Sequence, residues 1–492
     1  MKRLSFLIFI IGLFFTQALY ASERKEEGVG LTIYSTPTKG SYYTQTQPGF
    51  AIIKEWRRLF LKKGINTTSF QDVAKLIDPS TVSFKSLTDP EGTKVIEQNY
   101  EYDLVGRQKL LEKYIDQEIF LEHEYEETQE VVRRKGKLLS TTGGTVVEMD
   151  GEIHLDPKGR IILPSLKEGL ITKPTLVWLI QAKRSGEHLA KVTYETKGIG
   201  WNADYIAVVK ESDQALDLSG WVTIDNKSGA TYQDAELKLV AGDIHRVAPP
   251  GRVHEPMRYL TKAMAEKEEV GFVEKPFFEY HLYTLRQKTT LKDNSMKQLS
   301  LFDPASGVPV QKILLYYGHI GPYYFYSSPA MDRELGTRCN KKVDIYLTFK
   351  NAKSSNLGIP LPAGRVRVYK EDPDDASLEF IGEDWIDHTP KDEEVKLKLG
   401  CAFDVVGERK QTDFKVEYHH HWMEESFEIN LRNHKDEAVE VIVKENLFRW
   451  VNWEIKKSSH PYEKIDSRTI HFKVKVAKDE EKKITYTVRY TW

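Results

Sequence analysis

The sequence predicts a mainly β chain made of several β-sandwich domains, with a small β-barrel before residue 170 and an immunoglobulin-like sandwich at the C-terminus. Apolar and polar residues alternate through most of the chain, and such alternation is typical of strands with one buried face. Helical periodicity is confined to one short stretch near residue 110. The length of 492 residues is enough for about three domains.

Composition limits the classes of protein that the chain can belong to. Hydrophobic residues make up 40% and charged residues 29%, which excludes a polytopic membrane protein and a largely disordered chain. Lysine and arginine (71) nearly balance aspartate and glutamate (73), and no block of like charge dominates. The sequence therefore offers no electrostatic basis for binding nucleic acid, and we expect no nucleic-acid partner.

The first 21 residues are predicted to be a signal peptide. Lys2 and Arg3 precede an apolar stretch at 6–15, which is shorter than the roughly 20 residues needed to cross a bilayer. Small residues follow at Ala18 and Ala21, so cleavage is expected after Ala21. A retained N-terminal anchor is the alternative. No second apolar span follows, so we expect an exported protein, periplasmic or extracellular, whose mature chain has no transmembrane span.

Two domains are expected in the N-terminal third of the chain. Residues 22–105 are predicted to form a β-rich domain. Residues 106–168 combine short apolar runs with tight turns, which predicts a small β-barrel with one short helix over 107–115. Asp150-Gly151 is predicted to be a hairpin turn, because a primed turn needs positive φ at both central residues.

A central β-sandwich is predicted over residues 169–248, where the polar turn at 226–229 separates two alternating segments. Residues 249–276 contain paired prolines and few β-branched residues, which is typical of a linker or surface excursion. Alternation returns at 277–421, and we interpret this part as a β-rich elaboration of the central sandwich.

The C-terminal residues 422–492 are predicted to form an immunoglobulin-like β-sandwich. Apolar residues occupy alternate positions over 427–431, 439–443, 470–476 and 484–492, with polar turns between them. Four strands joined by short loops are what a small antiparallel sandwich requires.

Five stretches of this chain carry a resemblance to a known family. In chain order they are EQNYEYD at 97–103, LSTTGG at 139–144, GWNADY at 200–205, LPAG at 361–364 and LRNHKDE at 431–437. Together they resemble the bacterial domain-of-unknown-function 4139 family, which includes exported proteins described as mucoidy inhibitors. The resemblance runs from about residue 31 to the C-terminus. It implies an exported, β-rich protein with no assigned reaction, and it transfers no catalytic residue to this chain.

The two cysteines, Cys339 and Cys401, are a candidate disulfide, because the predicted export places them where thiols can oxidise. A bond between them would close a loop of about 60 residues and stabilise the fold by roughly 4 kcal/mol in the chain-entropy model. Two separate buried thiols are the alternative, since spacing alone does not place their Cα atoms within reach.

A tyrosine cluster is the candidate ligand or partner surface. It comprises Tyr316, Tyr317, Tyr323, Tyr324 and Tyr326, interrupted by a Gly-Pro segment. Exposed aromatic rings with hydroxyl tips stack on sugar faces or anchor a protein partner. Local packing at the end of a sandwich is the alternative interpretation.

The run His419-His420-His421 is the most evident candidate for metal binding. Successive residues of a strand point to opposite faces, so at most His419 and His421 would share one ion. No third ligand follows at short spacing, and an exposed loop or edge is the alternative.

The motifs of the common hydrolases, zinc proteases, nucleotide-binding and redox proteins do not occur in the sequence. We therefore predict no catalytic residue and no cofactor. The function expected is a non-catalytic structural or interaction role in the cell envelope, with a protein or a polysaccharide as partner. Two alternatives are an enzyme that acts on envelope polymer at an interdomain site and a glycan-binding module that uses the tyrosine loop.

Overall fold

The computed structural model describes residues 26–35, 49–101, 106–125, 130–165, 173–242, 244, 246, 272–319 and 327–492. Strands account for 66% and helices for 2% of these described residues, which confirms the predicted mainly β, multidomain sandwich class. The chain divides into two compact units, one of residues up to 31, 52–197 and 228–235, and one of residues 32–51, 198–227 and 236–492. The predicted signal peptide lies outside the described residues.

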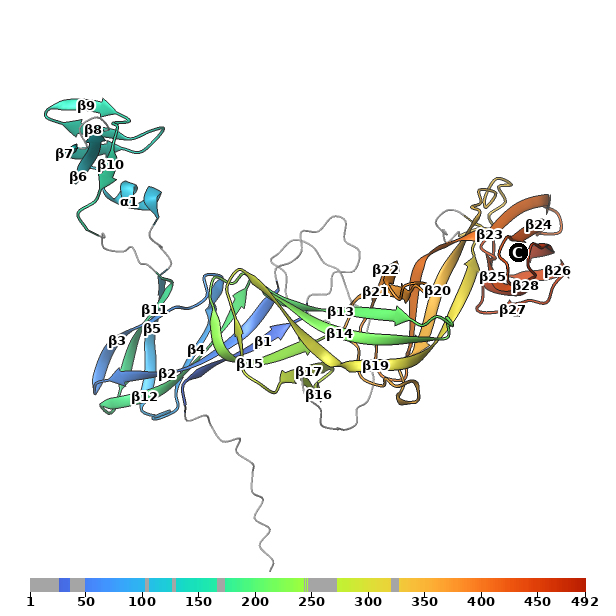
Figure 1. Ribbon diagram of the computed structural model, residues 1–492, viewed down its shortest axis with the longest axis horizontal. Coiled ribbons are helices and arrows are strands. Elements are labelled where there is room, and N and C mark those ends of the chain that lie inside the picture. The colour runs from blue at the N-terminus through green and yellow to red at the C-terminus, as the bar shows by residue number, and fades with distance from the viewer. Residues whose placement is uncertain are drawn as a thin grey trace, which may run out of the picture. The chain divides into compact units, whose positions relative to one another are not determined.

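The first unit contains a sandwich of two sheets (Figure 1). A buried tryptophan packs against residues of both sheets. One sheet has the order β3-β11-β5 and the other contains β2-β12-β4. Trp178 of β11 is fully buried, with its ring centroid 5.2 Å from those of Phe70 and Phe84. The strands are β1 (Gly28–Tyr34) and β2 (Phe50–Leu61), which both extend into the second unit, with β3 (Gly64–Gln71), β4 (Ile77–Ser86), β5 (Thr93–Glu101), β11 (Thr175–Ala182) and β12 (Gly186–Lys197).

Residues 106–125 and 130–165 form a small sheet with one helix, and the predicted barrel is wrong. The sheet order is β10-β6-β7-β8-β9, and among the described strands β9 and β10 remain unpaired edges. The helix supplies Leu111 and Tyr114 to the core under this sheet, so the apolar face is covered without closure. The elements are α1 (Arg107–Lys113), β6 (Glu118–Tyr125), β7 (Glu130–Ser140), β8 (Val146–Met149), β9 (Glu152–Leu155) and β10 (Arg160–Ile162).

The predicted hairpin turn at Asp150-Gly151 is confirmed. Met149 pairs with Glu152 across the turn, and the two central residues have φ of 52° and 83°. A positive φ is easy for glycine and tolerated by aspartate, so this dipeptide fixes the β8–β9 register.

The second unit begins with a sheet of the order β22-β21-β13-β14-β19. β21 is parallel to β13, whereas β14 is antiparallel to both β13 and β19. The inward face of β13 packs towards β17, where Trp201 meets Tyr283 edge to face at 6.3 Å. The strands are β13 (Ile199–Val209), β14 (Ala215–Asn226), β15 (Tyr232–Ala241), β16 (Phe272–Phe277), β17 (Tyr280–Leu285), β18 (Thr289–Leu291), β19 (Ser295–Tyr316), β21 (Gly364–Glu371) and β22 (Leu378–Ile386).

The second unit ends in the C-terminal sandwich (Figure 1). One sheet runs β20-β23-β24-β29-β26, and β25, β28 and β27 pair beside the end of β19. Phe427, Phe472 and Tyr486 stack between them with centroids 5.3 and 5.6 Å apart. The elements are β20 (Lys342–Lys350), η1 (Lys353–Ser355), β23 (Glu394–Glu417), β24 (Trp422–Asn433), β25 (Val439–Asn446), β26 (Trp453–Ser458), β27 (Glu463–Lys464), β28 (Thr469–Val476) and β29 (Glu481–Thr491).

Strand pairing divides the chain differently from the expected domains. β11 and β12 belong to the predicted central sandwich 169–248 but pair with β3, β5 and β4. The expected boundary between 421 and 422 falls in the turn of the β23–β24 hairpin. The predicted linker 249–276 lies mostly outside the described residues, but its last five residues are in β16. Alternation reports which residues are buried and not which strand lies alongside, so these pairings were not predictable from it.

In the described part of the chain, neither helix has the length and the apolar character that crossing a bilayer requires.

Candidate functional site

Of the five candidate tyrosines, the structure describes Tyr316 and Tyr317. Tyr316 is 0% exposed and donates its hydroxyl to the Asn340 carbonyl at 2.9 Å. Its ring continues the inward register of β19 after Leu314, so it belongs to the core of the C-terminal sandwich. The ring therefore packs locally, and the interpretation of Tyr316 as a ligand contact is wrong. Tyr323, Tyr324 and Tyr326 lie outside the described residues.

Tyr317 lies at the edge of this core and is half-buried. Burial raises the pKa of its hydroxyl to about 12, with a further contribution from Glu445. The Lys444 ammonium lies 5.8 Å from its ring centroid, within cation–π range. Tyr317 thus keeps its proton at neutral pH and stands next to the charged groups described below.

A segment with little regular structure, residues 327–340, leads towards β20 and is anchored to the C-terminal sandwich. The Ala330 amide donates to the Arg449 carbonyl at 3.0 Å, and the Asn340 amide donates to the Gly318 carbonyl at 2.8 Å. Between these two residues the segment is held mainly by side chains that reach it from the sandwich. We refer to residues 327–340 as the anchored segment.

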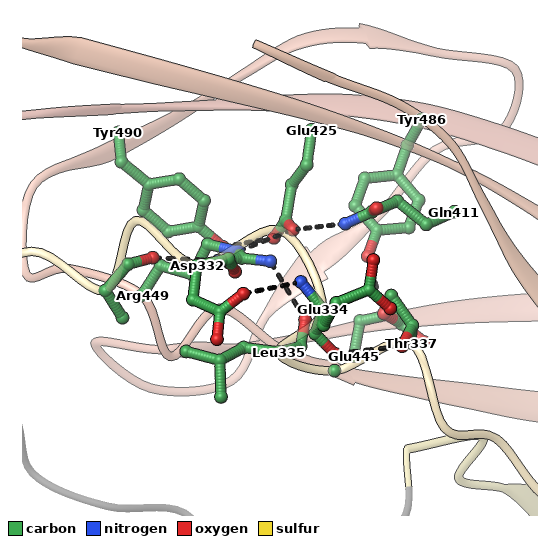
Figure 2. Close-up of polar contacts among 12 residues, drawn as sticks. Asp332, Glu334, Leu335, Thr337, Gln411, Glu425, Glu445, Arg449, Tyr486 and Tyr490 are labelled. Atoms are coloured by element: carbon green, nitrogen blue, oxygen red, sulfur yellow. Dashed lines mark hydrogen bonds and ion pairs between the residues drawn. The ribbon is translucent and has the colours of Figure 1, made fainter. Parts of the chain in front are cut away.

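Arg449 makes most of these contacts (Figure 2). Its side chain is 0% exposed, and its Nε lies 2.7 Å from Oε2 of the buried Glu425. Its two terminal nitrogens donate to three carbonyls of the anchored segment, those of Ala330 and Asp332 at 2.7 Å and that of Leu335 at 2.9 Å. One buried guanidinium therefore satisfies a carboxylate and three backbone acceptors at once.

Arg409 holds the following part of the segment in the same way. Its Nε lies 3.0 and 2.9 Å from the two carboxylate oxygens of Glu445, and its Nη1 donates to the Gly336 carbonyl at 2.8 Å. The guanidinium carbon stands 3.7 Å over the Phe427 ring. Burial alone would lower the pKa of Arg409, but Glu445 and the other acidic neighbours together outweigh it and hold that pKa well above its usual value. Arg409 is therefore permanently charged.

Two tyrosines complete the coordination of the buried carboxylates. Tyr486 donates to Glu445, and Tyr490 donates to Oε1 of Glu425 at 3.1 Å. Burial first, and then the neighbouring carboxylates, raise the pKa of both hydroxyls well above the usual value. Figure 2 shows the Tyr490 hydroxyl and the Gln411 amide directed at Glu425. Every carboxylate oxygen of Glu425 and Glu445 accepts a hydrogen bond, so the network joins several segments of the chain.

The buried network is costly, and its cost identifies its role. Two arginine–glutamate pairs lie inside an apolar sandwich, where desolvation offsets much of their attraction. Apolar side chains of similar volume would fill the same core, so the fold itself does not require these charges. What the charges add is a set of donors to the backbone of the anchored segment. The network fixes the conformation of that segment on the outside of the sandwich.

The outward side of the anchored segment carries charges of both signs. Asp332, Arg333, Glu334 and Arg338 are exposed, and Glu334 donates its amide to the Asp332 carboxylate at 2.9 Å. The buried guanidiniums contact the backbone of the segment from within the sandwich. The side chains of these four residues face solvent. The arrangement presents a rigid, polar and mixed-charge strip, which is suited to recognition by a partner.

His319 lies beside this network. Its ring stacks on Phe448 with centroids 5.4 Å apart, and it forms an isolated bridge to Cys339. Burial, followed by the charge of Arg409, lowers the pKa of His319 below its usual value. The imidazole is therefore neutral at pH 7.

The two cysteines are free thiols in the structure. The Cys339 thiol donates to the Thr337 carbonyl at 3.4 Å, within the anchored segment. Cys401 is exposed and donates to Asp344 at 3.4 Å, and burial followed by Asp344 raises the pKa of its thiol. Separate thiols therefore replace the candidate disulfide in this structure, although only Cys339 is shielded from solvent.

The three histidines form the turn of the β23–β24 hairpin. His419, His420 and His421 are all exposed, and His421 has a φ of 53°. The His421 ring lies edge to face with Trp492 at 6.2 Å. Within the described residues, no group of three or more histidine, cysteine, aspartate or glutamate side chains is arranged to hold a metal ion.

The buried network was not predicted from the sequence, although a signal for it exists. Glu425 shares the inward parity of β24 with Met423 and Phe427, and Glu445 shares that of β25 with Val441 and Val443. A charged residue on the apolar face of an alternating strand is rare unless it is paired. Two such glutamates in strands that follow one another along the chain are the pattern that predicts buried arginine partners.

Comparison with known proteins found no match to this chain, neither among family models nor among curated proteins.

Arg449→Met should lower the free energy of unfolding by about 3–5 kcal/mol, because Glu425 would stay buried without its cation. Arg489→Met is the matched control: Arg489 pairs with Glu424 at 2.7 Å, but both side chains are partly exposed, so its loss should cost at most about 1 kcal/mol. Urea unfolding followed by tryptophan fluorescence measures both. Equal losses in the two variants would contradict the role given to the buried pair.

Stability should also fall on mild acidification. The lowered pKa of His319 means that the unfolded chain takes up a proton at higher pH than the folded chain. The stability that the neutral His319 contributes is therefore complete above about pH 6.5, and it is lost as the pH falls through the lowered pKa of the folded state. His471 shifts in the same direction, through burial and then Lys444. His319→Gln should reduce the slope of unfolding free energy between about pH 5 and 7, and an unchanged slope would show that His319 does not contribute.

Proposed function

We propose that this chain is an exported protein of the bacterial cell envelope that acts by non-catalytic binding and presents fixed surfaces to a protein or polysaccharide partner. The observation that carries the proposal is the buried network of Arg409, Glu445, Arg449 and Glu425. Its donors converge on the backbone of the anchored segment. A segment fixed at such energetic cost is suited to recognition, since a preordered surface loses little conformational entropy when it binds.

Three further observations support this proposal. The apolar stretch at 6–15, preceded by Lys2 and Arg3 and followed by Ala21, is typical of a cleaved export signal. The resemblance to an exported family without an assigned reaction favours the same location and a non-catalytic role. Linked β-sandwiches suit display, because a rigid scaffold positions loops and sheet faces for partners.

In-cell photo-crosslinking tests the proposal. A photoreactive amino acid replaces Arg333, which is exposed on the anchored segment, and in a control chain it replaces the exposed Lys391. We expect the Arg333 position to capture one reproducible envelope component and the Lys391 position to capture none. The capture should weaken several-fold when Arg449→Met is added, because the segment then loses three of its anchoring hydrogen bonds. Equal capture from both positions, or no capture from Arg333, would contradict a binding role for this segment.

A further inference from the structure

A second surface of the same unit has the chemistry of a binding site. It lies on the outward face of β14, β13, β21 and β22, neighbouring strands of one sheet. Trp221 pairs with Asp204, and Asp204 pairs with Arg365 on the other side. Arg365 pairs in turn with Trp385. These four residues therefore form one row across the sheet, which we call the cross-strand row.

The cross-strand row opens to solvent at Trp221 and Arg365, whereas Asp204 between them is buried, with 9% of the residue exposed. Ala203 and Tyr205, which flank Asp204 in β13, are 0% exposed, and so is Val222 next to Trp221. The Trp221 side is open, with 38% of the residue exposed, and the Arg365 side chain is 43% exposed. The exposed indole and the exposed guanidinium offer a ligand an apolar ring and hydrogen-bond donors on one sheet face.

Asp204 is held in place from one side of the row. Its Oδ2 accepts hydrogen bonds from the side-chain amide of Asn202 at 2.9 Å and from the Thr223 hydroxyl at 2.7 Å. Its Oδ1 faces Arg365 and Arg367 at 3.8 and 3.7 Å. The carboxylate is thus oriented by hydrogen bonds to its own sheet, and its second oxygen is directed towards the two guanidinium groups.

The two guanidinium groups retain donors for a ligand. Their contacts to Asp204, and to Glu383 at 3.9 and 3.6 Å, are all longer than a hydrogen bond. Among the described residues, Nε of Arg365 and Nε1 of Trp385 have no hydrogen-bond partner, and both atoms are shielded from solvent. A shielded donor without an acceptor is unfavourable, so these two atoms are poorly satisfied, while the exposed part of the Arg365 side chain remains open to a ligand.

We propose that the cross-strand row binds an uncharged polysaccharide. A sugar ring offers an apolar face to an indole and a rim of hydroxyl groups that donate and accept hydrogen bonds, and the row places indoles at its ends with a carboxylate and a guanidinium between them. Two arginines balance Asp204 and Glu383, so the surface favours a ligand without net charge. The two tryptophan positions are three strand spacings apart, about 14 Å, which suits an extended chain of sugars.

This inference rests on the proposed binding role and names the ligand class at a surface other than the anchored segment. A protein or an acidic glycan would be recognised by different chemistry. The core of a protein–protein interface is typically depleted of charged residues, whereas the centre of this row is charged. An acidic glycan requires an excess of positive charge, which Asp204 and Glu383 remove here.

Affinity electrophoresis of the full chain tests the inference. Native gels contain a soluble neutral glycan (dextran, galactomannan or a mixed-linkage β-glucan) or the acidic glycan alginate. We expect retardation by at least one neutral glycan and none by alginate. Trp221→Ala and Trp385→Ala should each weaken the retardation about tenfold, and Arg365→Gln, which keeps a planar amide but removes the charge, should weaken it less.

Phe403→Ala is the matched control, because Phe403 is an aromatic residue of the same unit that is 94% exposed and lies in β23. The Phe403→Ala variant should be retarded as much as the unchanged chain. Circular dichroism of every variant verifies that it is folded. Retardation by none of the neutral glycans, retardation by alginate alone, or equal retardation of Trp221→Ala and the unchanged chain would overturn the inference. None of these results affects the crosslinking test at Arg333, so the inference and the proposed function fail separately.

Discussion

The anchored segment depends on two arginines that are charged inside the apolar core of the C-terminal sandwich. Arg449 is paired with Glu425 and Arg409 with Glu445, and the side chains of all four are at most 3% exposed. Each guanidinium has more donors than its carboxylate accepts, and the remaining donors reach outwards to backbone carbonyls. The same charges thus join the interior of the sandwich to residues 330–336 on its outside. If one charge were removed, both the core and the anchored segment would lose a partner.

The buried network and the cross-strand row use polar groups in opposite ways. In the buried network, each carboxylate oxygen of Glu425 and Glu445 already accepts a hydrogen bond from the protein. In the cross-strand row, the contacts of Arg365 and Arg367 are too long to be hydrogen bonds, and donors remain for a ligand. Polar groups in the first case position the chain, and in the second they remain accessible. Both features support the binding role proposed above.

Much of the fold was predictable because alternation is a direct consequence of strand geometry. The inward residues of β28 and β29 are buried where the alternation placed them, and Asp150-Gly151 adopts the turn that its φ requirements predicted. Alternation does not report partners, so the pairing of β11 with β3 and β5 and the open edges of the five-stranded sheet were missed. Tyr316 was misassigned because its register in β19, and not its amphipathic side chain, determines its burial. The buried network needed a different signal, charged residues at inward positions such as Glu425.

Hydrogen–deuterium exchange of the unmodified chain tests the central claim most directly, because it measures whether the anchored segment is fixed in solution. The Ala330 and Asn340 amides donate to carbonyls of Arg449 and Gly318, and the arginines hold the backbone between them. The account predicts that both amides exchange as slowly as those of the neighbouring core strands. Exchange at the rate of an unprotected exposed loop would show that the buried charges do not hold this segment, and it would contradict the account.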